Sequence, residues 1–211
     1  MTEPAFLRAT RASWDALAAD YAERSRHEPA SKPLARAMLG AFAETVRTGP
    51  VVDAGSGPGH VTAFLAALGL DIRGIDLSPG MVAEARRAHP GLRFDVGTMT
   101  ALDLPDGALA GLVAWYSIIH VPPDRLPGVF GEFHRVLASG GRLLLAFQVG
   151  DEPRHVTEVF GHPVTLDFHR LRPARVAELL ERTGFVVDAR LERAPDASER
   201  SPQAHILAHR P

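Results

Sequence analysis

Three glycines at alternate positions follow a short apolar segment near residue 50. Residues 51–59 read Val-Val-Asp-Ala-Gly-Ser-Gly-Pro-Gly, and apolar side chains then recur at i, i+3, i+4 and i+7 from Val61. This spacing predicts a helix packed on one face, so the stretch predicts a strand, a tight loop and a helix. Glycine permits positive φ angles and leaves bare backbone for a ligand, and the start of a helix offers unpaired N–H groups to polar or anionic atoms.

An acidic residue ends the next apolar segment. Residues 72–75, Ile-Arg-Gly-Ile, are expected to form a second strand, and Asp76 follows them. A carboxylate at the tip of that strand can accept hydrogen bonds from both hydroxyl groups of a ribose. The combination predicts a binding site for a nucleoside cofactor; the alternative is a glycine-rich connection beside a solvated aspartate.

The spacing of the glycines separates two classes of cofactor. The dinucleotide fingerprint G-x-G-x-x-G would put its third glycine at His60, whereas the third glycine comes early, at Gly59. The form D-x-G-x-G-x-G resembles motif I of class I S-adenosylmethionine-dependent methyltransferases, and residues 75–81, Ile-Asp-Leu-Ser-Pro-Gly-Met, resemble the next motif of that family. The resemblance covers residues 14–209. It implies S-adenosylmethionine as cofactor and S-adenosylhomocysteine as product.

The resemblance also implies which residues hold the cofactor. Residues after the third strand flank the adenine in this family, and here Thr98 and Met99 stand where an acid is common. Small methyltransferases of this kind use helices before the first strand as a lid, and Tyr21 matches their aromatic residue near the methionine end; Trp14 is interpreted as a core anchor. The expected cofactor-binding residues are Tyr21, Asp53, Gly55, Ser56, Gly57, Gly59, Asp76, Leu77, Met81, Thr98, Met99 and Trp115.

The end of the fourth expected strand gathers aromatic and polar side chains. Ligands of open α/β sheets collect beyond the carboxyl ends of the strands, so we expect the methyl acceptor to bind there. The expected acceptor-binding residues are Trp115, Tyr116, His120 and His162. An acceptor hydroxyl or protonated amine needs a base, and histidine is the natural one near neutral pH. His120 is the first candidate for this base, with His162 and His169 as alternatives; His120 as a plain pocket wall stays open.

The elements that must position these residues predict an α/β fold. The resemblance implies a Rossmann-like, doubly wound sheet of seven mostly parallel strands, in the order 3-2-1-4-5-7-6, with an antiparallel last strand and an N-terminal helical cap. We expect residues 1–211 to form one methyltransferase domain, in which residues 1–48 are a cap or lid and residues 49–211 the α/β core. Residues 1–12 are a loose lead-in with Ser13 as N-cap of the first helix. The fifth strand begins at Arg142, after Ser139-Gly140-Gly141 ends a helix.

Residues 148–171 are the least regular part of the sequence. A long irregular segment in a compact domain is often functional. Its place after the fifth strand favours an insertion that lines the acceptor pocket.

Composition excludes several classes of function. The chain has 211 residues, a formal net charge of −2 and no cysteine, and Lys32 is its single lysine. The charge disfavours nucleic acid or anionic membrane as a partner. Without a membrane-length apolar run or a signal-peptide pattern at residues 1–4, we expect a cytoplasmic protein, monomeric or homodimeric. A metal site could use His120, His155, His162 and His169 with Asp151 or Asp167, but their spacings match no metal-ligand pattern, so no metal is expected.

The leading interpretation is a methyltransferase that transfers a methyl group to a small, apolar or aromatic molecule at an oxygen, nitrogen or carbon atom by direct in-line displacement. One rival is an NAD(P)-dependent oxidoreductase of Rossmann type, and another is a non-catalytic S-adenosylmethionine-binding protein. Nucleic-acid and protein acceptors are disfavoured because residues 115–118 read Trp-Tyr-Ser-Ile in place of an N/D-P-P-Y/F passage.

Overall fold

A mixed seven-stranded sheet forms the centre of the molecule. The computed structural model describes residues 3–211, so Met1 and Thr2 of the expected lead-in lie outside the described residues. The strands of the sheet are β1 (Val51–Ala54), β2 (Ile72–Asp76), β3 (Arg93–Val96), β4 (Leu109–Trp115), β5 (Leu137–Gln148), β8 (Val186–Arg193) and β9 (Gln203–His209). Their order is β3-β2-β1-β4-β5-β9-β8. Strand β9 runs antiparallel to both of its neighbours, and the other neighbouring strands pair in parallel. The predicted fold class and strand order are therefore confirmed.

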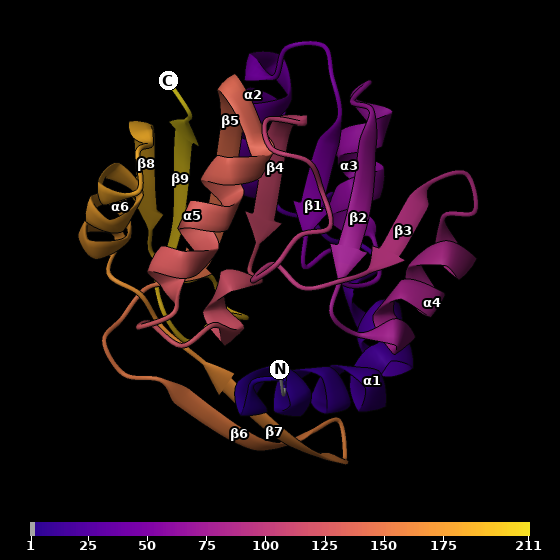
Figure 1. Ribbon diagram of the computed structural model, residues 1–211. Helices are drawn as coiled ribbons and strands as arrows, with labels where there is room; N and C mark the ends of the chain where they lie inside the picture. The colour runs from indigo at the N-terminus through magenta and orange to yellow at the C-terminus, as the bar shows by residue number, and fades with distance from the viewer. Residues whose placement is uncertain (1–2) are drawn as a thin grey trace.

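Helices cover both faces of this sheet (Figure 1). They are α1 (Ala5–Ser25), α2 (Pro33–Thr45), α3 (His60–Ala67), α4 (Pro79–Ala88), α5 (Leu126–Val136) and α6 (Pro173–Arg182), with a single 3-10 turn, η1 (Ile118–His120). Side chains of β5 alternate between the faces, as the twofold repeat of a strand requires. Leu143 and Leu145 pack with Phe130 and other residues of α5 and α6, whereas Leu144 packs with Phe42 of α2. Within residues 3–211 no helix combines the length and the apolar character needed to cross a bilayer.

Helix α1 lies across the carboxyl ends of the central strands, as Figure 1 shows. It begins at Ala5, so the expected loose lead-in and the expected N-cap at Ser13 are wrong. Ser13 lies inside the helix, where its Oγ donates to the carbonyl of Thr165 at 3.2 Å and accepts from the N–H of Thr165 at 2.9 Å. A serine is favourable at a cap because its hydroxyl competes for backbone groups. Here the backbone group is on another element, which the sequence does not show.

The segment 148–171 is more regular than expected. It contains a hairpin of β6 (Arg154–Val159) and β7 (His162–Phe168), joined through Phe160 and Gly161 at φ angles of 53° and 81°. Two central residues with positive φ are the mark of a tight hairpin turn. Val156 and Leu166 of the hairpin pack on Leu17 of α1. The hairpin and α1 together form a layer outside the main sheet.

The junction between α5 and β5 also differs from the expectation. The helix ends at Val136, and β5 starts at Leu137 in place of Arg142. Leu137 already pairs with Leu109 of β4, and the register then shifts so that Arg142 pairs with Gly111. The two glycines that resemble a helix stop lie within an irregular strand.

Candidate active site

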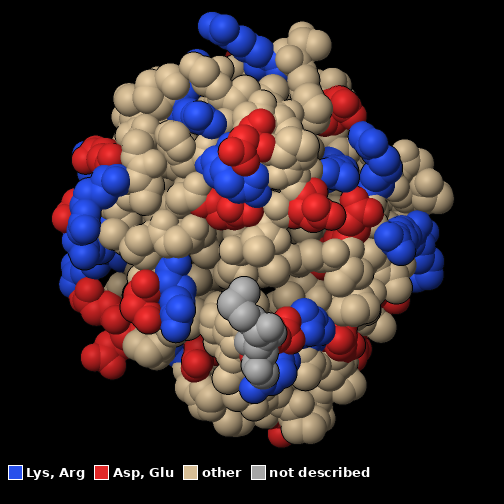
Figure 2. Space-filling model, in the orientation of Figure 1, with Lys and Arg blue, Asp and Glu red and all other residues tan. Residues whose placement is uncertain are grey.

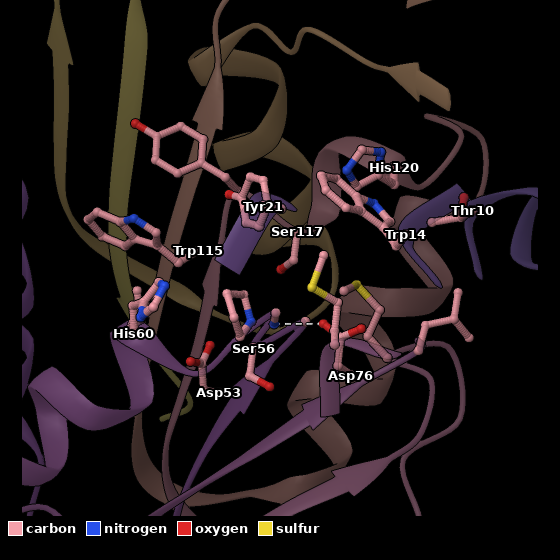
Figure 3. A pocket seen from close by; sticks show the side chains of 18 of the residues that line it. Thr10, Trp14, Tyr21, Asp53, Ser56, His60, Asp76, Trp115, Ser117 and His120 are labelled. Atoms are coloured by element: carbon pink, nitrogen blue, oxygen red, sulfur yellow. Dashed lines mark hydrogen bonds between the residues drawn. The ribbon is translucent and has the colours of Figure 1, made fainter. Parts of the chain in front are cut away.

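A cavity lies between the carboxyl ends of the sheet strands and α1. Its wall brings together two groups of residues that come from different parts of the chain. We call the first the loop end: Asp53, residues 55–57 and Asp76. We call the second the aromatic end: Trp14, Tyr21 and His120. Figure 3 shows Trp14 and His120 together on one side of the pocket and Asp53 and Asp76 on another.

The backbone of the glycine loop builds the loop end. Gly55 has a φ of 79°, and a Cβ there would lie 2.3 Å from the Cβ of Ser117. Ser117 itself is fixed, because its Oγ donates to the carbonyl of Ala54 at 2.6 Å. Only glycine fits this position without displacing Ser117. Gly59 lies deeper: it is the N-cap of α3, a Cβ would meet the Phe94 ring at 2.6 Å, and it is absent from the described lining of the cavity.

Asp76 is held by backbone donors at the tip of β2. Its Oδ2 accepts from the N–H of Gly57 at 2.7 Å, and its Oδ1 accepts from the N–H of Ser78 at 2.8 Å. Burial raises the pKa of this carboxyl group to about 6, against the effect of those two hydrogen bonds. The carboxylate is therefore fixed before any ligand arrives, and its remaining lone pairs can accept hydroxyl donors from the cavity.

Asp53 has a carboxylate oxygen that nothing in the described chain satisfies. Its Oδ2 accepts from the Thr62 hydroxyl at 2.7 Å, whereas Oδ1 is buried without a partner among residues 3–211. Burial raises the pKa of Asp53 to about 7, so the site favours a proton or a cation there. Buried polar atoms are normally paired. A ligand with an ammonium group would supply the missing partner, and the amino group of S-adenosylmethionine fits this requirement.

The floor between the two ends is largely apolar. Leu77, Met81 and Met99 line it, and Thr98 contributes a hydroxyl that already bonds the Thr100 hydroxyl at 2.9 Å. Helix α1 is anchored beside this floor. Asp15 Oδ1 accepts from the Ser78 hydroxyl at 2.5 Å and from the N–H of Gly80 at 2.9 Å, at the start of α4.

The aromatic end is a cluster of rings. Trp14 packs edge-on against Tyr21, with ring centroids 5.0 Å apart, and against His120 at 5.4 Å. Burial raises the pKa of Tyr21 to about 12, with smaller contributions from Glu28 and Asp76. Trp14 packs against the buried cluster that contains Leu17 and Leu166, as the interpretation of a core anchor expects, and it also lines the cavity.

His120 has a defined tautomer. Its Nδ1 lies 3.0 Å from the backbone carbonyl of Asp167. A carbonyl only accepts, so Nδ1 carries the hydrogen and Nε2 carries a free lone pair. Burial lowers the pKa of His120 to about 4, so the ring is neutral near pH 7. The Phe168 ring packs on it at 4.8 Å. This side chain can accept a proton inside the cavity.

Of the residues expected from sequence, Gly59 and His162 are not brought to the cavity. His162 lies on the hairpin, where its Nε2 bonds Asp20 of α1 at 2.8 Å. The alternative base His169 is absent from the described lining, and its backbone N–H donates to Ile119 at 2.7 Å. Among residues 3–211 no group of three or more histidine, cysteine or acidic side chains is placed to hold a metal ion.

Several lining residues were missed by the sequence analysis. Most come from α1 and the linker after it: Phe6, Leu7, Thr10, Trp14, Ser25, Glu28 and Pro29. The others lie beside expected positions: Pro58, His60, Val61, Gly97, Ser117 and Val121. The sequence did contain a pattern that could have identified the lining residues of α1. Positions 7, 10, 14, 21 and 25 follow the spacing of one helix face, which continues upstream of Ser13.

Comparison with known proteins agrees with this geometry. The profile of a methyltransferase domain family matches residues 51–141. Trans-aconitate 2-methyltransferase of Methylobacterium nodulans is 38% identical over 162 residues, which are 72% of this chain and 57% of that protein. Demethylmenaquinone methyltransferase of Beutenbergia cavernae is 38% identical over 96 residues, 46% of this chain and 39% of that protein. The chain thus spans 57% and 39% of the lengths of these two relatives.

Solved structures resemble most or all of the chain. One is the 1,6-didemethyltoxoflavin-N1-methyltransferase of Burkholderia thailandensis, solved with 1,6-didemethyltoxoflavin and S-adenosylhomocysteine. Its TM-score is 0.76 at 21% identity, covering 100% of this chain and 91% of that one. A SAM-dependent methyltransferase of Methanosarcina mazei has a TM-score of 0.71 at 18% identity, covering 81% of this chain and 96% of that one. The sequence-based resemblance is confirmed: the chain contains a methyltransferase domain and has the fold of the class I S-adenosylmethionine-dependent methyltransferases.

Proposed function

We propose that this protein transfers a methyl group from S-adenosylmethionine to a small molecule. One observation carries the proposal: a single cavity joins the buried, unsatisfied Asp53 and the fixed Asp76 to a ring cluster that contains a neutral histidine. The first two groups suit a cofactor with an ammonium group and a ribose. The third group suits an acceptor that must lose a proton.

The loop end would hold the cofactor. Asp76 would accept hydrogen bonds from the ribose hydroxyls, and Asp53 Oδ1 would accept one from the ammonium group. The backbone of residues 55–57 would lie against the ligand. The adenine would rest on the apolar floor, while Gly59 would support the loop from below. The full proposed set is Tyr21, Asp53, Gly55, Ser56, Gly57, Asp76, Leu77, Met81, Thr98, Met99 and Trp115.

The aromatic end would hold the acceptor. When bound, S-adenosylmethionine supplies a methyl group on a sulfonium, so an acceptor lone pair forms a bond to the methyl carbon while the S–C bond breaks and its electron pair stays on sulfur. The chain must orient the acceptor in line with that bond and exclude water. His120 Nε2 would take the proton that the acceptor loses. Trp115 and Tyr116 would contribute to the acceptor wall.

Helix α1 and the hairpin would act as a lid. Trp14 and Tyr21 of α1 line the cavity, and the backbone carbonyl of Asp167 on β7 orients His120. Ser13 joins the helix to the hairpin through two hydrogen bonds. This arrangement supports the cap role expected for residues 1–48. Residues 148–171, expected to line the acceptor pocket, are absent from its described lining and act on it only through His120.

Surface charge supports a small-molecule acceptor. Figure 2 shows acidic and basic side chains interspersed over one face of the molecule, and the net charge is −2. A protein that binds the phosphate backbone of a nucleic acid usually presents a basic surface. The names of the relatives include both an acid and a quinone precursor as acceptors, so they leave the charge of this acceptor open.

Calorimetric titration of the purified protein with S-adenosylmethionine, S-adenosylhomocysteine and NADH tests the proposal. Both adenosyl ligands should bind, and NADH should give no heat of binding. Asp76→Ala should weaken S-adenosylhomocysteine binding by about 1.5–3 kcal/mol, because hydrogen bonds to a charged group are lost.

Asp95→Ala is the matched control. Asp95 lies on the neighbouring strand β3 and pairs only with Arg73 on the surface, so its removal should leave the affinity unchanged. Binding of NADH alone, or equal affinities for wild type and Asp76→Ala, would contradict the proposal.

A further inference from the structure

The walls of the cavity contain carboxylates and no permanent cation. Asp53, Asp76 and Glu28 line it, whereas no lysine or arginine is among its described lining residues. Its two histidines are not cations near pH 7. Burial lowers the pKa of His120 to about 4, and burial also lowers the pKa of His60. The protein itself therefore offers no positive charge to a ligand at either end.

Basic side chains close to the lining are already paired. Arg11, whose Nε donates to the Leu77 carbonyl at 3.2 Å, forms an ion pair with Glu3 at 2.5 Å. Lys32 lies 3.3 Å from both Glu28 and Glu199. Each cation is thus partly neutralised by a carboxylate of the chain, which weakens the attraction that it could exert on a ligand.

Rings form the acceptor wall. The Trp14 ring stands edge to face with Tyr21, at 5.0 Å between centroids, and with His120, at 5.4 Å, and Phe6 also lines the cavity. Such a wall suits a flat, apolar ligand, because aromatic faces gain from stacking and edge contacts. The free lone pair of His120 Nε2 is the one acceptor in this cluster whose position is fixed by a second hydrogen bond.

A carboxylate on the acceptor would be desolvated here without a counter-charge from the protein. Such a group would enter a wall of aromatic rings, and the cost of its desolvation opposes binding. An O–H or N–H group on an aromatic ring carries no charge to desolvate, and it can donate a hydrogen bond to His120 Nε2. Any negative charge then develops only at the reacting atom, beside the methyl group it receives.

We propose that the acceptor is an uncharged aromatic ring bearing an O–H or N–H group, and that the cavity excludes carboxylate-bearing acceptors. The proposal rests on the proposed methyltransferase function. It adds the charge and the shape of the acceptor to that function.

Matched probes test this selection. Calorimetry in the presence of saturating S-adenosylhomocysteine compares 2-naphthol and benzimidazole, which carry the O–H and N–H groups, with 2-naphthoate, which has the naphthalene ring of the first probe and a carboxylate. At least one neutral probe should bind about tenfold or more tightly than 2-naphthoate, equivalent to about 1.4 kcal/mol. Mass spectrometry after incubation with S-adenosylmethionine then shows which of the two neutral probes is methylated.

Two variants of the protein test the same charge selection. Thr10 lines the cavity from α1, beside Trp14 and His120 in Figure 3. Thr10→Lys should improve 2-naphthoate binding about tenfold by supplying the missing cation, whereas the neutral Thr10→Met of similar length should not. S-adenosylhomocysteine titration and circular dichroism of both variants check that the fold and the loop end persist.

The outcomes separate the two proposals. If S-adenosylhomocysteine fails to bind the wild type, the methyltransferase function fails. If it binds, but 2-naphthoate binds as well as the neutral probes, or none of the three binds, the charge selection is overturned. Equal gains for Thr10→Lys and Thr10→Met would overturn it as well.

Discussion

The loop end and the aromatic end of the cavity are built in opposite ways. At the loop end, the parts are close in sequence: Gly57 and Ser78 hold Asp76 through backbone N–H groups, across separations of 19 and 2 residues. At the aromatic end, the scaffold joins distant segments. Ser13 bonds Thr165 across 152 residues, and His120 bonds Asp167 across 47.

Because of this difference, the two ends should tolerate amino-acid substitutions differently. A site made from backbone and short turns depends on a few residues that have no substitutes. A site made from packed side chains can be rebuilt with other rings without disturbing the loop. We therefore expect mutations at the loop end to alter cofactor affinity, and mutations at the aromatic end to alter turnover and acceptor choice.

The largest effect is expected at the aromatic end. His120→Ala should lower kcat about 10²–10⁴-fold, the range for loss of a general base, and leave S-adenosylhomocysteine affinity intact. Turnover with the best probe of the neutral aromatic series measures this. His155→Ala is the control, since His155 is exposed on the hairpin and bonds the Asp167 carboxylate. Unchanged turnover in His120→Ala would show that His120 only lines the pocket. Loss of both turnover and cofactor binding would show that His120 is needed for the structure.

A substitution at the loop end should produce the reverse pattern. Gly55→Ala places a Cβ 2.3 Å from the Ser117 Cβ at a φ of 79°. The combined cost of left-handed backbone and overpacking is about 2–5 kcal/mol, and it should fall mainly on cofactor affinity and thermal stability. Gly128→Ala, where a Cβ meets nothing within 4 Å, is the matched control and should resemble wild type. If Gly55→Ala binds S-adenosylhomocysteine normally, the loop end is more adaptable than its geometry indicates.

Cofactor affinity should depend on pH through Asp53. Its pKa is raised to about 7, so the carboxyl group is mostly protonated near pH 6 and must lose that proton to pair with an ammonium group. The affinity for S-adenosylhomocysteine should therefore rise with pH, by up to about tenfold between about pH 6 and about pH 8, since one pKa unit corresponds to 1.36 kcal/mol.

Calorimetry in buffers of different ionisation enthalpy should show proton release on binding below about pH 7. Asp53→Asn should bind more weakly and lose this pH dependence. A retained slope in Asp53→Asn would assign the proton to another group, with Asp76, whose pKa is raised to about 6, as the nearest candidate.

The smallest effect is expected at the surface contact between α1 and the hairpin. Asp20→Asn weakens the bond to His162, an exposed pair worth about 0.2–1 kcal/mol. Thermal unfolding should shift only slightly, and cofactor affinity should not change. A drop in cofactor affinity as large as that expected for Gly55→Ala would show that the two ends are coupled through α1.

The same contrast explains what the sequence could predict. Asp53, the glycines and Asp76 form a local motif, and eleven of the expected cofactor residues reach the cavity while Gly59 does not. The place of Trp14 in the cavity wall was not foreseen, because it depends on η1, which approaches α1 only in the folded chain. The hairpin itself was missed because only Val156, Val164 and Leu166 are buried within it, and their partner is Leu17, far away in sequence.

The two tryptophans of the chain, Trp14 and Trp115, both line the cavity, one from α1 and one from β4. The intrinsic near-ultraviolet emission of the protein therefore originates almost entirely from the walls of this one site. Trp115 packs beside His205 and Trp14 beside His120, so the two indoles sense different neighbours. Replacing either with phenylalanine would leave a single optical reporter, and the pair of variants would time the arrival of cofactor and acceptor separately.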